Sequence, residues 1–169
     1  MKLFLIGLPG VGKSYFGEKL ANLTKTDFFD LDTVIEQQLG MSIPEVFKTK
    51  GEEYFREVEA KALADLIYQN QSYVISTGGG TPCFHNGIDQ MLKHGKVIYL
   101  QASIEKIKTN LSSNSEATKR PLLQEDKIAD KLKQLLTVRE AVYKKAGHIV
   151  NMDQPENKIL DELVRKINY

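Results

Sequence analysis

The sequence predicts an α/β fold of three layers, in which helices cover both faces of a five-stranded parallel sheet. Short apolar runs alternate along the chain with longer stretches of helical spacing. Strands that alternate with helices favour a parallel sheet, because each helix carries the chain back across one face of the sheet. The length of 169 residues suits a single domain over residues 1–169 with a sizeable buried core.

The composition narrows the classes of partner. Lys and Arg total 23 against 22 Asp and Glu, and the net charge of +1 is spread evenly. No basic stripe therefore calls for nucleic acid or an anionic membrane. A single cysteine, Cys83, cannot form an internal disulfide, and no apolar run is long enough to cross a bilayer. We expect a cytoplasmic protein, most simply a monomer, without a targeting sequence.

A glycine-rich loop joins the first strand, residues 3–8, to the first helix, residues 13–23. Residues 7–14 read GLPGVGKS, which fits the G-x-x-x-x-G-K-[ST] pattern of a phosphate-binding P-loop between a strand and a helix. The glycines let backbone N–H groups point at phosphate oxygens, and the helix adds its positive end. The alternative is a strand-to-helix turn that binds nothing, and the Lys-Ser that follows the glycines argues against it.

The P-loop residues have distinct expected roles. Lys13 brings a point charge to the β- and γ-phosphates of a nucleoside triphosphate. The Ser14 hydroxyl is placed to ligate Mg²⁺, a cation that prefers oxygen ligands. The predicted nucleotide-binding set within this loop is Gly10, Val11, Gly12, Lys13, Ser14 and Tyr15.

Two carboxylates follow at the end of the second predicted strand, residues 26–32. Alternation along a strand puts Asp30 and Asp32 on one face. Ligands of parallel α/β sheets bind beyond the carboxyl ends of the strands. Asp30 could therefore hold Mg²⁺ through its waters, and Asp32 could accept a proton from a substrate hydroxyl. Alternatively, Asp32 only caps the helix that begins at Thr33.

Helices are predicted for residues 33–39, from Ser42 onward, and for residues 51–69. Arg56 and Glu59 are three apart and therefore neighbours on the last of these helices. An exposed Arg/Glu pair is ordinarily a solvated surface feature, and the spacing alone favours that interpretation. Beside an anionic substrate, the same pair would fix the guanidinium as a two-pronged clamp for a carboxylate.

The third predicted strand, residues 72–77, ends in Gly78, Gly79 and Gly80. Three glycines at the end of a buried strand permit a ligand to approach bare backbone and can offer several N–H donors. A flexible connector is the alternative, but connectors seldom need three consecutive glycines here.

After a fourth strand at residues 96–101 and a helix from Ser103, the chain becomes polar over residues 112–121. In a phosphotransferase such a loop is a candidate lid that excludes water from the reaction. Arg120 would then lie over the transferring phosphoryl group, although Arg120 as solvated surface remains the alternative. The remaining predicted elements are an amphipathic helix at residues 125–145, which carries Arg139 and Tyr143, a fifth strand at 148–151 and a terminal helix at 155–167.

These residues together resemble the shikimate kinases over essentially the whole chain. The motifs that carry the resemblance are Asp30-Leu31-Asp32; Phe47 with Gly51-Glu52, Phe55-Arg56 and Glu59; Gly78-Gly79-Gly80; Arg120-Pro121-Leu122-Leu123; and Arg139 with Tyr143. The resemblance implies a fold like the nucleoside monophosphate kinases, with a helical substrate-binding region at about residues 33–60 and a mobile lid at about residues 112–124. It also implies transfer of the γ-phosphoryl group of ATP, with Mg²⁺, to the 3-hydroxyl of shikimate, a step toward chorismate and the aromatic amino acids.

The resemblance implies roles residue by residue. Asp32 would hold the substrate hydroxyls as the candidate base, and Asp30 would order the waters of the magnesium ion. Arg56 and Arg139 would bind the shikimate carboxylate, and Glu59 would then hold Arg56 in place rather than form a solvated surface pair with it. The backbone at Gly78, Gly79 and Gly80 would contact shikimate, while Lys13 and Arg120 would stabilise charge on the phosphates.

One position departs from the family pattern, and rival functions remain. Where the family commonly carries an arginine that stacks on adenine, this chain has Asn110. Adenine would then contact another group, such as Lys108 or the loop at residues 151–155. The rivals are a gluconate-type kinase, a nucleoside monophosphate kinase and a regulatory module that binds nucleotide without catalysis. The paired arginines beside three glycines argue against the first two rivals, and the intact Lys13 and Asp32 argue against the third.

Overall fold

A computed structural model describes residues 1–113 and 122–168 of the chain. Its centre is a sheet of five strands in the order β2-β3-β1-β4-β5, and every neighbouring pair is parallel. The strands are β1 (Lys2–Ile6), β2 (Asp27–Asp30), β3 (Tyr73–Ser76), β4 (Lys96–Gln101) and β5 (His148–Asn151). The predicted five-stranded parallel sheet of an α/β fold is confirmed.

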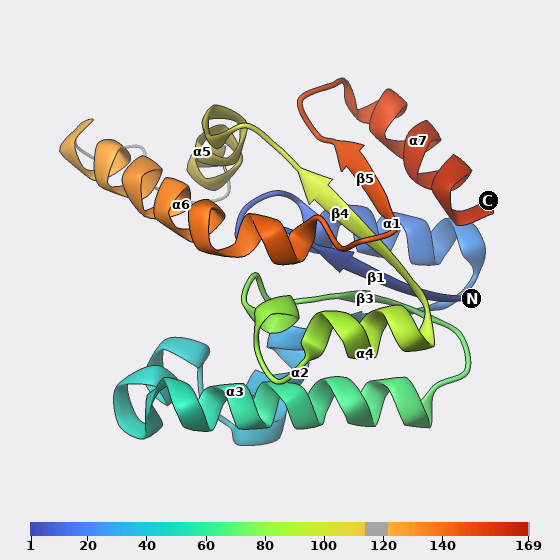
Figure 1. The fold of residues 1–169 in the computed structure, drawn as a ribbon, viewed down its shortest axis with the longest axis horizontal. Coiled ribbons are helices and arrows are strands. Elements are labelled where there is room, and N and C mark those ends of the chain that lie inside the picture. The colour runs from blue at the N-terminus through green and yellow to red at the C-terminus, as the bar shows by residue number, and fades with distance from the viewer. Residues whose placement is uncertain (114–121, 169) are drawn as a thin grey trace.

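Helices flank this sheet on both faces. They are α1 (Lys13–Thr24), α2 (Leu31–Leu39), α3 (Ile43–Gln69), α4 (Gly87–His94), α5 (Ile104–Ser113), α6 (Leu122–Tyr143) and α7 (Glu156–Asn168), with a short 3₁₀ turn η1 (Thr81–Cys83). Figure 1 shows α1 behind the strands and α4 in front of them, while α2 and α3 lie together beside β2. Among the described residues, no helix is both long and apolar enough to cross a membrane.

The core explains why the strands read as continuous apolar runs. Leu3, Phe4, Leu5 and Ile6 of β1 are each 0% exposed, as expected where helices cover both faces of a parallel sheet. From β1 the chain moves toward one edge of the sheet to form β2, and from β3 it moves toward the opposite edge to form β4. This reversal creates a crevice at the carboxyl end of β1, which is where open α/β sheets bind their ligands.

The second strand ends earlier than the sequence pattern predicts. β2 stops at Asp30, and α2 begins at Leu31, so the expectation that Asp32 lies on the strand is wrong. The reason is local: Asp30 Oδ1 accepts hydrogen bonds from the backbone N–H groups of Asp32, at 3.1 Å, and Thr33, at 3.3 Å. Asp30 is therefore the helix cap, and Asp32 lies in the first turn of α2.

Two other elements differ from the expectation. Gly51 interrupts α3 with φ 84° and ψ 171°, a conformation open essentially only to glycine; the two predicted helices therefore meet at this kink. The crossover helix α4 was not predicted, although its buried Ile88 and Met91 are three residues apart on one face. Residues 112–113 and 122–124 of the predicted lid belong to α5 and α6, and Arg120 lies outside the described residues.

Candidate active site

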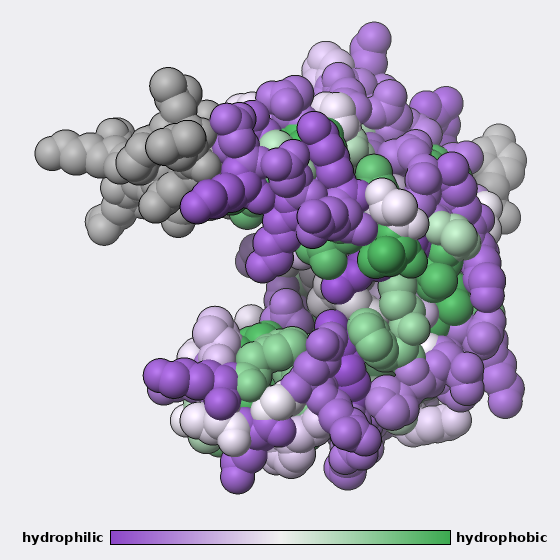
Figure 2. All heavy atoms as spheres, turned by 60° about the vertical axis from the view of Figure 1, so that its left-hand side comes forward, coloured by the Kyte–Doolittle hydropathy of each residue, from purple (hydrophilic) through white to green (hydrophobic). Residues whose placement is uncertain are grey.

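A cleft of about 450 Å³ opens at the carboxyl ends of the central strands. Figure 2 shows it as a deep hollow between the part of the molecule that carries α6, above, and the part that carries α3, below. The P-loop forms its floor, Asp30 and Asp32 lie at one end, and Met152 and Glu156 lie at the other. The P-loop therefore lies in one cleft between the two carboxylates and the start of α7.

The P-loop backbone is held in a shape that requires glycine. Gly7 and Gly10 have φ of +146° and +82°, and a Cβ at Gly10 would lie 2.8 Å from the side chain of Leu111 on α5. The Asn110 side chain donates a hydrogen bond to the Gly10 carbonyl at 3.0 Å. The loop therefore packs directly against α5, and Asn110 contacts protein backbone in this structure.

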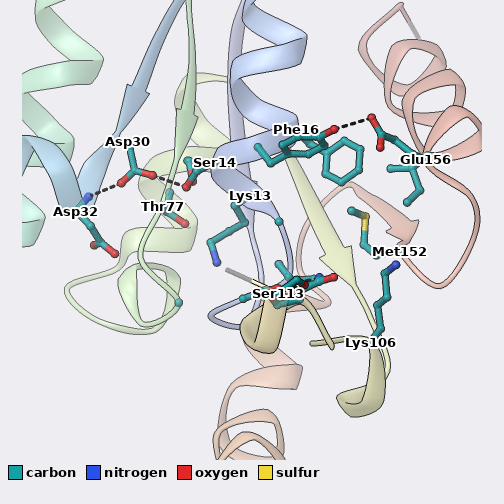
Figure 3. Close-up of a pocket in the computed structure, with 18 of the residues that line it drawn as sticks. Lys13, Ser14, Phe16, Asp30, Asp32, Thr77, Lys106, Ser113, Met152 and Glu156 are labelled. Atoms are coloured by element: carbon teal, nitrogen blue, oxygen red, sulfur yellow. Dashed lines mark hydrogen bonds between the residues drawn. The ribbon is translucent and has the colours of Figure 1, made fainter. Parts of the chain in front are cut away.

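Lys13 is buried against its own loop. Its ammonium donates to the carbonyls of Gly7, at 3.0 Å, and Leu8, at 2.9 Å. Burial lowers the pKa of Lys13 to about 8, although the carboxylates of Asp32 and Asp30 oppose the shift. Figure 3 shows the ammonium directed into the cleft. A positioned cation is thus present where phosphates would approach the loop.

Oxygen atoms gather beside Lys13. The Ser14 hydroxyl donates a short hydrogen bond to Asp30 and lies 3.3 Å from the Ser76 hydroxyl. Mg²⁺ prefers oxygen ligands and commonly uses one hydroxyl or carboxylate together with water and substrate phosphates. The donor set at Ser14 and Asp30 therefore fits a magnesium ion that accompanies a nucleotide.

Asp32 has an unusual electrostatic environment. Burial, together with the neighbouring carboxylates of Asp30 and Glu59, raises its pKa to about 6, although Lys13 opposes the shift. A carboxyl group with a pKa near neutrality is suited to exchanging a proton with a hydroxyl. Asp32 is therefore the best-placed candidate base among the described residues.

Arg56 and Glu59 form a buried pair, so the solvated-surface interpretation that their spacing alone favours is wrong. They are 7% and 2% exposed, and Arg56 Nη1 donates to Glu59 Oε2 at 2.8 Å. Glu59 Oε1 accepts a second bond, of 2.6 Å, from the Thr81 hydroxyl of η1. The burial arises because α3 packs against the turn that follows β3.

Each of the three consecutive glycines abuts a different charged side chain. A Cβ added at Gly78 would lie 3.0 Å from Asp32 Oδ1 and 2.9 Å from Glu59 Oε1. A Cβ at Gly79 would lie 3.2 Å from Arg139 Nη1, and one at Gly80 would lie 2.5 Å from both Nη atoms of Arg56. These glycines let two guanidinium groups and one candidate base approach the same stretch of backbone. Such an arrangement can bind a ligand that carries one carboxylate and neighbouring hydroxyls.

α6 is anchored to the same stretch. The Tyr143 hydroxyl donates to the Gly79 carbonyl at 2.5 Å, and Arg139 lies one turn earlier on the helix. The described residues that line the cleft include Asp32 and Gly79 but neither Arg56 nor Arg139. Both arginines therefore lie next to the cleft without opening into it in this structure.

Several contacts in the site had weak or no sequence signals. Tyr15, predicted to bind nucleotide, donates its hydroxyl to Glu156 at 2.7 Å across the far end of the cleft. Glu156 also accepts from Lys19 at 2.6 Å, a link between α1 and α7 that no motif indicates. Glu52 contacts Arg56, and its i,i+4 spacing could have indicated this.

The fold and the site together define a P-loop kinase that phosphorylates a small molecule. A lysine and a serine at a helix start face two carboxylates, and two arginines stand beside them. The family model for shikimate kinase matches residues 9–168, and the chain belongs to the shikimate kinase family. It is accordingly an ATP-dependent phosphotransferase that acts on an alcohol group.

Individual relatives agree with this family. The chain is 36% identical over 166 residues to the shikimate kinase of Sulfurihydrogenibium sp. (strain YO3AOP1), covering 98% of this chain and 96% of the relative. It is 39% identical over 148 residues to that of Francisella tularensis subsp. novicida (strain U112), covering 88% and 82%. The predicted family and enzyme class are confirmed.

Solved structures give the same result. The crystal structure of shikimate kinase from Bacteroides thetaiotaomicron matches with a TM-score of 0.89 and 30% identity over 100% of this chain and 99% of that one. Shikimate kinase from Acinetobacter baumannii, solved in complex with shikimate, matches with 0.85 and 30% over 99% and 92%. A gluconokinase from Sinorhizobium meliloti reaches 0.63 at 13% identity over 99% and 91%, which shows a shared fold alone.

Proposed function

We propose that this enzyme transfers the γ-phosphoryl group of Mg·ATP to the 3-hydroxyl of shikimate, giving shikimate 3-phosphate and ADP on the route to aromatic amino acids. One observation carries the choice of acceptor. Asp32, Arg139 and Arg56 meet Gly78, Gly79 and Gly80 in turn, which matches a ligand with hydroxyls at one end and a carboxylate at the other. The relative solved in complex with shikimate supports the same choice.

On the nucleotide side, backbone N–H groups of Gly10, Val11, Gly12, Ser14 and Tyr15 would bind the phosphates at the start of α1. Lys13 would exchange its bonds to loop carbonyls for bonds to the β- and γ-phosphates. Arg120 lies outside the described residues, so its role is inferred from the sequence motif alone: it would stabilise charge on the transferring phosphoryl group.

Ser14 and Asp30 would hold the magnesium ion of Mg·ATP, directly or through its waters, because their oxygens already gather at one point. When bound, the ion would neutralise charge on the β- and γ-phosphates. A reaction that consumes ATP suits the cytoplasm, which is the location we propose, with a single chain as the active unit.

On the acceptor side, Arg56 and Arg139 would bind the carboxylate, and Asp32 would accept a hydrogen bond from the reacting hydroxyl. Phosphoryl transfer passes through a loose transition state with little proton movement at its start. Positioning the hydroxyl in line with the γ-phosphate should therefore matter more than the basicity of Asp32.

A coupled ADP-release assay with Mg·ATP tests the proposal, with shikimate, gluconate and AMP compared as acceptors at equal concentration. We expect only shikimate to stimulate ADP release. Arg139→Ala should abolish that stimulation at shikimate concentrations that saturate the parent enzyme, and Arg139→Lys should restore part of it. Stimulation by gluconate or AMP but not by shikimate would refute the assigned acceptor.

A further inference from the structure

Arg56 is held by two carboxylates that differ in strength and exposure. Glu59, 2% exposed, accepts from Nη1 at 2.8 Å and has its other oxygen bound by Thr81. Glu52 places one oxygen against both Nε, at 3.3 Å, and Nη2, at 3.2 Å, and its side chain is 57% exposed. Only the contact with Glu59 is therefore both short and buried, and the Thr81 hydroxyl holds the second carboxylate oxygen of Glu59.

The surroundings leave the guanidinium few other open directions. One part of it lies against the Gly80 backbone, where even a Cβ would come within 2.5 Å of both Nη atoms. The Phe84 ring lies over it, with its centroid 4.1 Å from Cζ. Glu52 covers the Nε/Nη2 edge, which is one of the two edges that can bind a carboxylate with parallel hydrogen bonds.

The charge balance opposes an incoming anion while Glu52 remains in place. Two carboxylates on one guanidinium leave the trio Arg56, Glu52 and Glu59 with an excess negative charge. A second anion brought within a few ångströms would be repelled unless one carboxylate withdrew. Glu52 is the one free to do so, since solvent reaches most of its side chain and its bonds to Arg56 are long.

We propose that Glu52 is an internal competitor for the acceptor carboxylate, occupying the Nε/Nη2 edge of Arg56 until the acceptor displaces it. This rests on the proposed function, in which Arg56 binds the carboxylate of shikimate. The exchange is one carboxylate for another on a fixed guanidinium. Glu52 directly follows Gly51, where the helix is interrupted, so its side chain can withdraw into solvent without displacing Arg56.

The exchange would lower the affinity of the enzyme for every ligand that binds Arg56 through a carboxylate. A ligand that offers only a carboxylate gains at Arg56 little more than Glu52 loses, because the two groups have the same chemistry. Any carboxylate could gain at Arg139 as well, but only a ligand with hydroxyls, such as shikimate, would gain in addition at Asp32. Glu52 therefore lowers the occupancy of the site by weakly bound monocarboxylates, while shikimate, with its further contacts, still binds; the affinities for both ligands fall by the same factor.

The test compares Glu52→Gln with Glu53→Gln, which removes the same charge from the adjacent exposed position of α3. Two quantities are measured for each variant: the KM for shikimate, and the Kd by calorimetry for cyclohex-1-ene-1-carboxylate, which lacks the hydroxyls. In Glu52→Gln, both should fall by about two- to five-fold, the range of a partly exposed ion pair. The effect should lie in KM rather than kcat, because Glu52 has already left Arg56 in the complex with acceptor.

Other outcomes separate this role from a supporting one. Glu59→Gln should raise KM, because it removes the partner that fixes Arg56. If Glu52→Gln also raises KM, Glu52 orients Arg56 and the competition is refuted. Equal values for the parent and Glu52→Gln, or equal falls in Glu52→Gln and Glu53→Gln, would refute it as well. If the parent does not phosphorylate shikimate, the proposed function fails, while calorimetry with the monocarboxylate still tests the competition.

Discussion

The Lys13 ammonium is already positioned in the absence of nucleotide, because it is buried and donates hydrogen bonds to the carbonyls of Gly7 and Leu8. Removing a charge that stabilises the transition state typically costs a hundred-fold or more in rate. We therefore expect Lys13→Ala to lower kcat by roughly a hundred-fold or more, measured by ADP release at saturating shikimate. Circular dichroism should show an unchanged fold. A kcat within a few-fold of the parent would remove Lys13 from the catalytic group.

Asp32 gives the site a pH dependence with a definite sign. Burial raises its pKa to about 6, so the carboxylate is present above that pH and is lost as the pH falls through it. A protonated Asp32 accepts hydrogen bonds from shikimate hydroxyls less well. Shikimate binding to the enzyme without nucleotide or metal should therefore weaken below about pH 6, as measured by calorimetry from pH 5 to 8. Asp32→Asn is the control, and an equal pH dependence in both proteins would contradict the assignment.

The sequence carries less information about burial than about chemistry at this scale. The spacing of Arg56 and Glu59 shows that they are neighbours but cannot show that they are buried. Their burial depends on η1, which packs on them from more than twenty positions along the chain. The prediction that Asp32 lies on the strand failed for a more local reason, since the capping bonds of Asp30, the last residue of β2, start a helix at once. P-loop chemistry, in contrast, is fixed by a short contiguous motif.

Among the elements, the segment after β3 depends on glycine because two helices deliver arginines to it. In Gly80→Ala, the new Cβ would lie 2.5 Å from both Nη atoms of Arg56, so the guanidinium must move. We expect the KM for shikimate to rise by about ten-fold or more, comparable to losing one charged hydrogen bond, with a smaller change in the KM for ATP. Gly147→Ala is the matched control, because no heavy atom lies within 4 Å of its added Cβ. An unchanged shikimate KM in Gly80→Ala would contradict the packing argument.

Tyr143 couples α6 to the same segment through its hydroxyl. Tyr143→Phe removes the donor to the Gly79 carbonyl and leaves that acceptor without its partner, while the ring remains 0% exposed. We expect a loss of about 1–3 kcal/mol in the free energy of unfolding, measured by urea denaturation. The KM for shikimate should rise modestly because Arg139 lies one turn away on α6. A stability equal to the parent would show that the hydrogen bond is replaced by water.

Element boundaries show where local patterns suffice. Strands of continuous apolar residues were predictable because both sheet faces are covered, and the split of α3 was predictable from Gly51. α4 was missed because its single turn of buried residues, Ile88 and Met91, is too short to stand out from loop composition. Its existence follows from topology instead, since parallel β3 and β4 need a crossover between them.

At the scale of the whole molecule, alternation of strands and helices predicts the parallel sheet but not the strand order β2-β3-β1-β4-β5. That order decides which loops meet at the carboxyl end of β1. It brings the P-loop, the start of α2 and the glycine segment after β3 to one cleft. The convergence of Asp32 with two arginines is therefore a property of the fold, and the family resemblance, rather than any spacing, made it predictable.

The proposed ligands bind opposite ends of one cleft, and only the folded chain has this cleft. Each ligand should therefore stabilise the whole molecule independently of the other. Ligand at about 100 times its Kd adds about 2.7 kcal/mol to the free energy of unfolding. For a chain of this length, that corresponds to a rise of roughly 5–11 °C in Tm. Shikimate and Mg·ATP should each produce such a shift in the parent, measured by differential scanning calorimetry. Arg139→Ala should lose the shift with shikimate and keep most of the shift with Mg·ATP, because its guanidinium abuts Gly79 and its charge is the weakest of those that act on Lys13. Loss of both shifts would mean that Arg139 supports the fold rather than the acceptor site, and retention of the shikimate shift would place the carboxylate elsewhere.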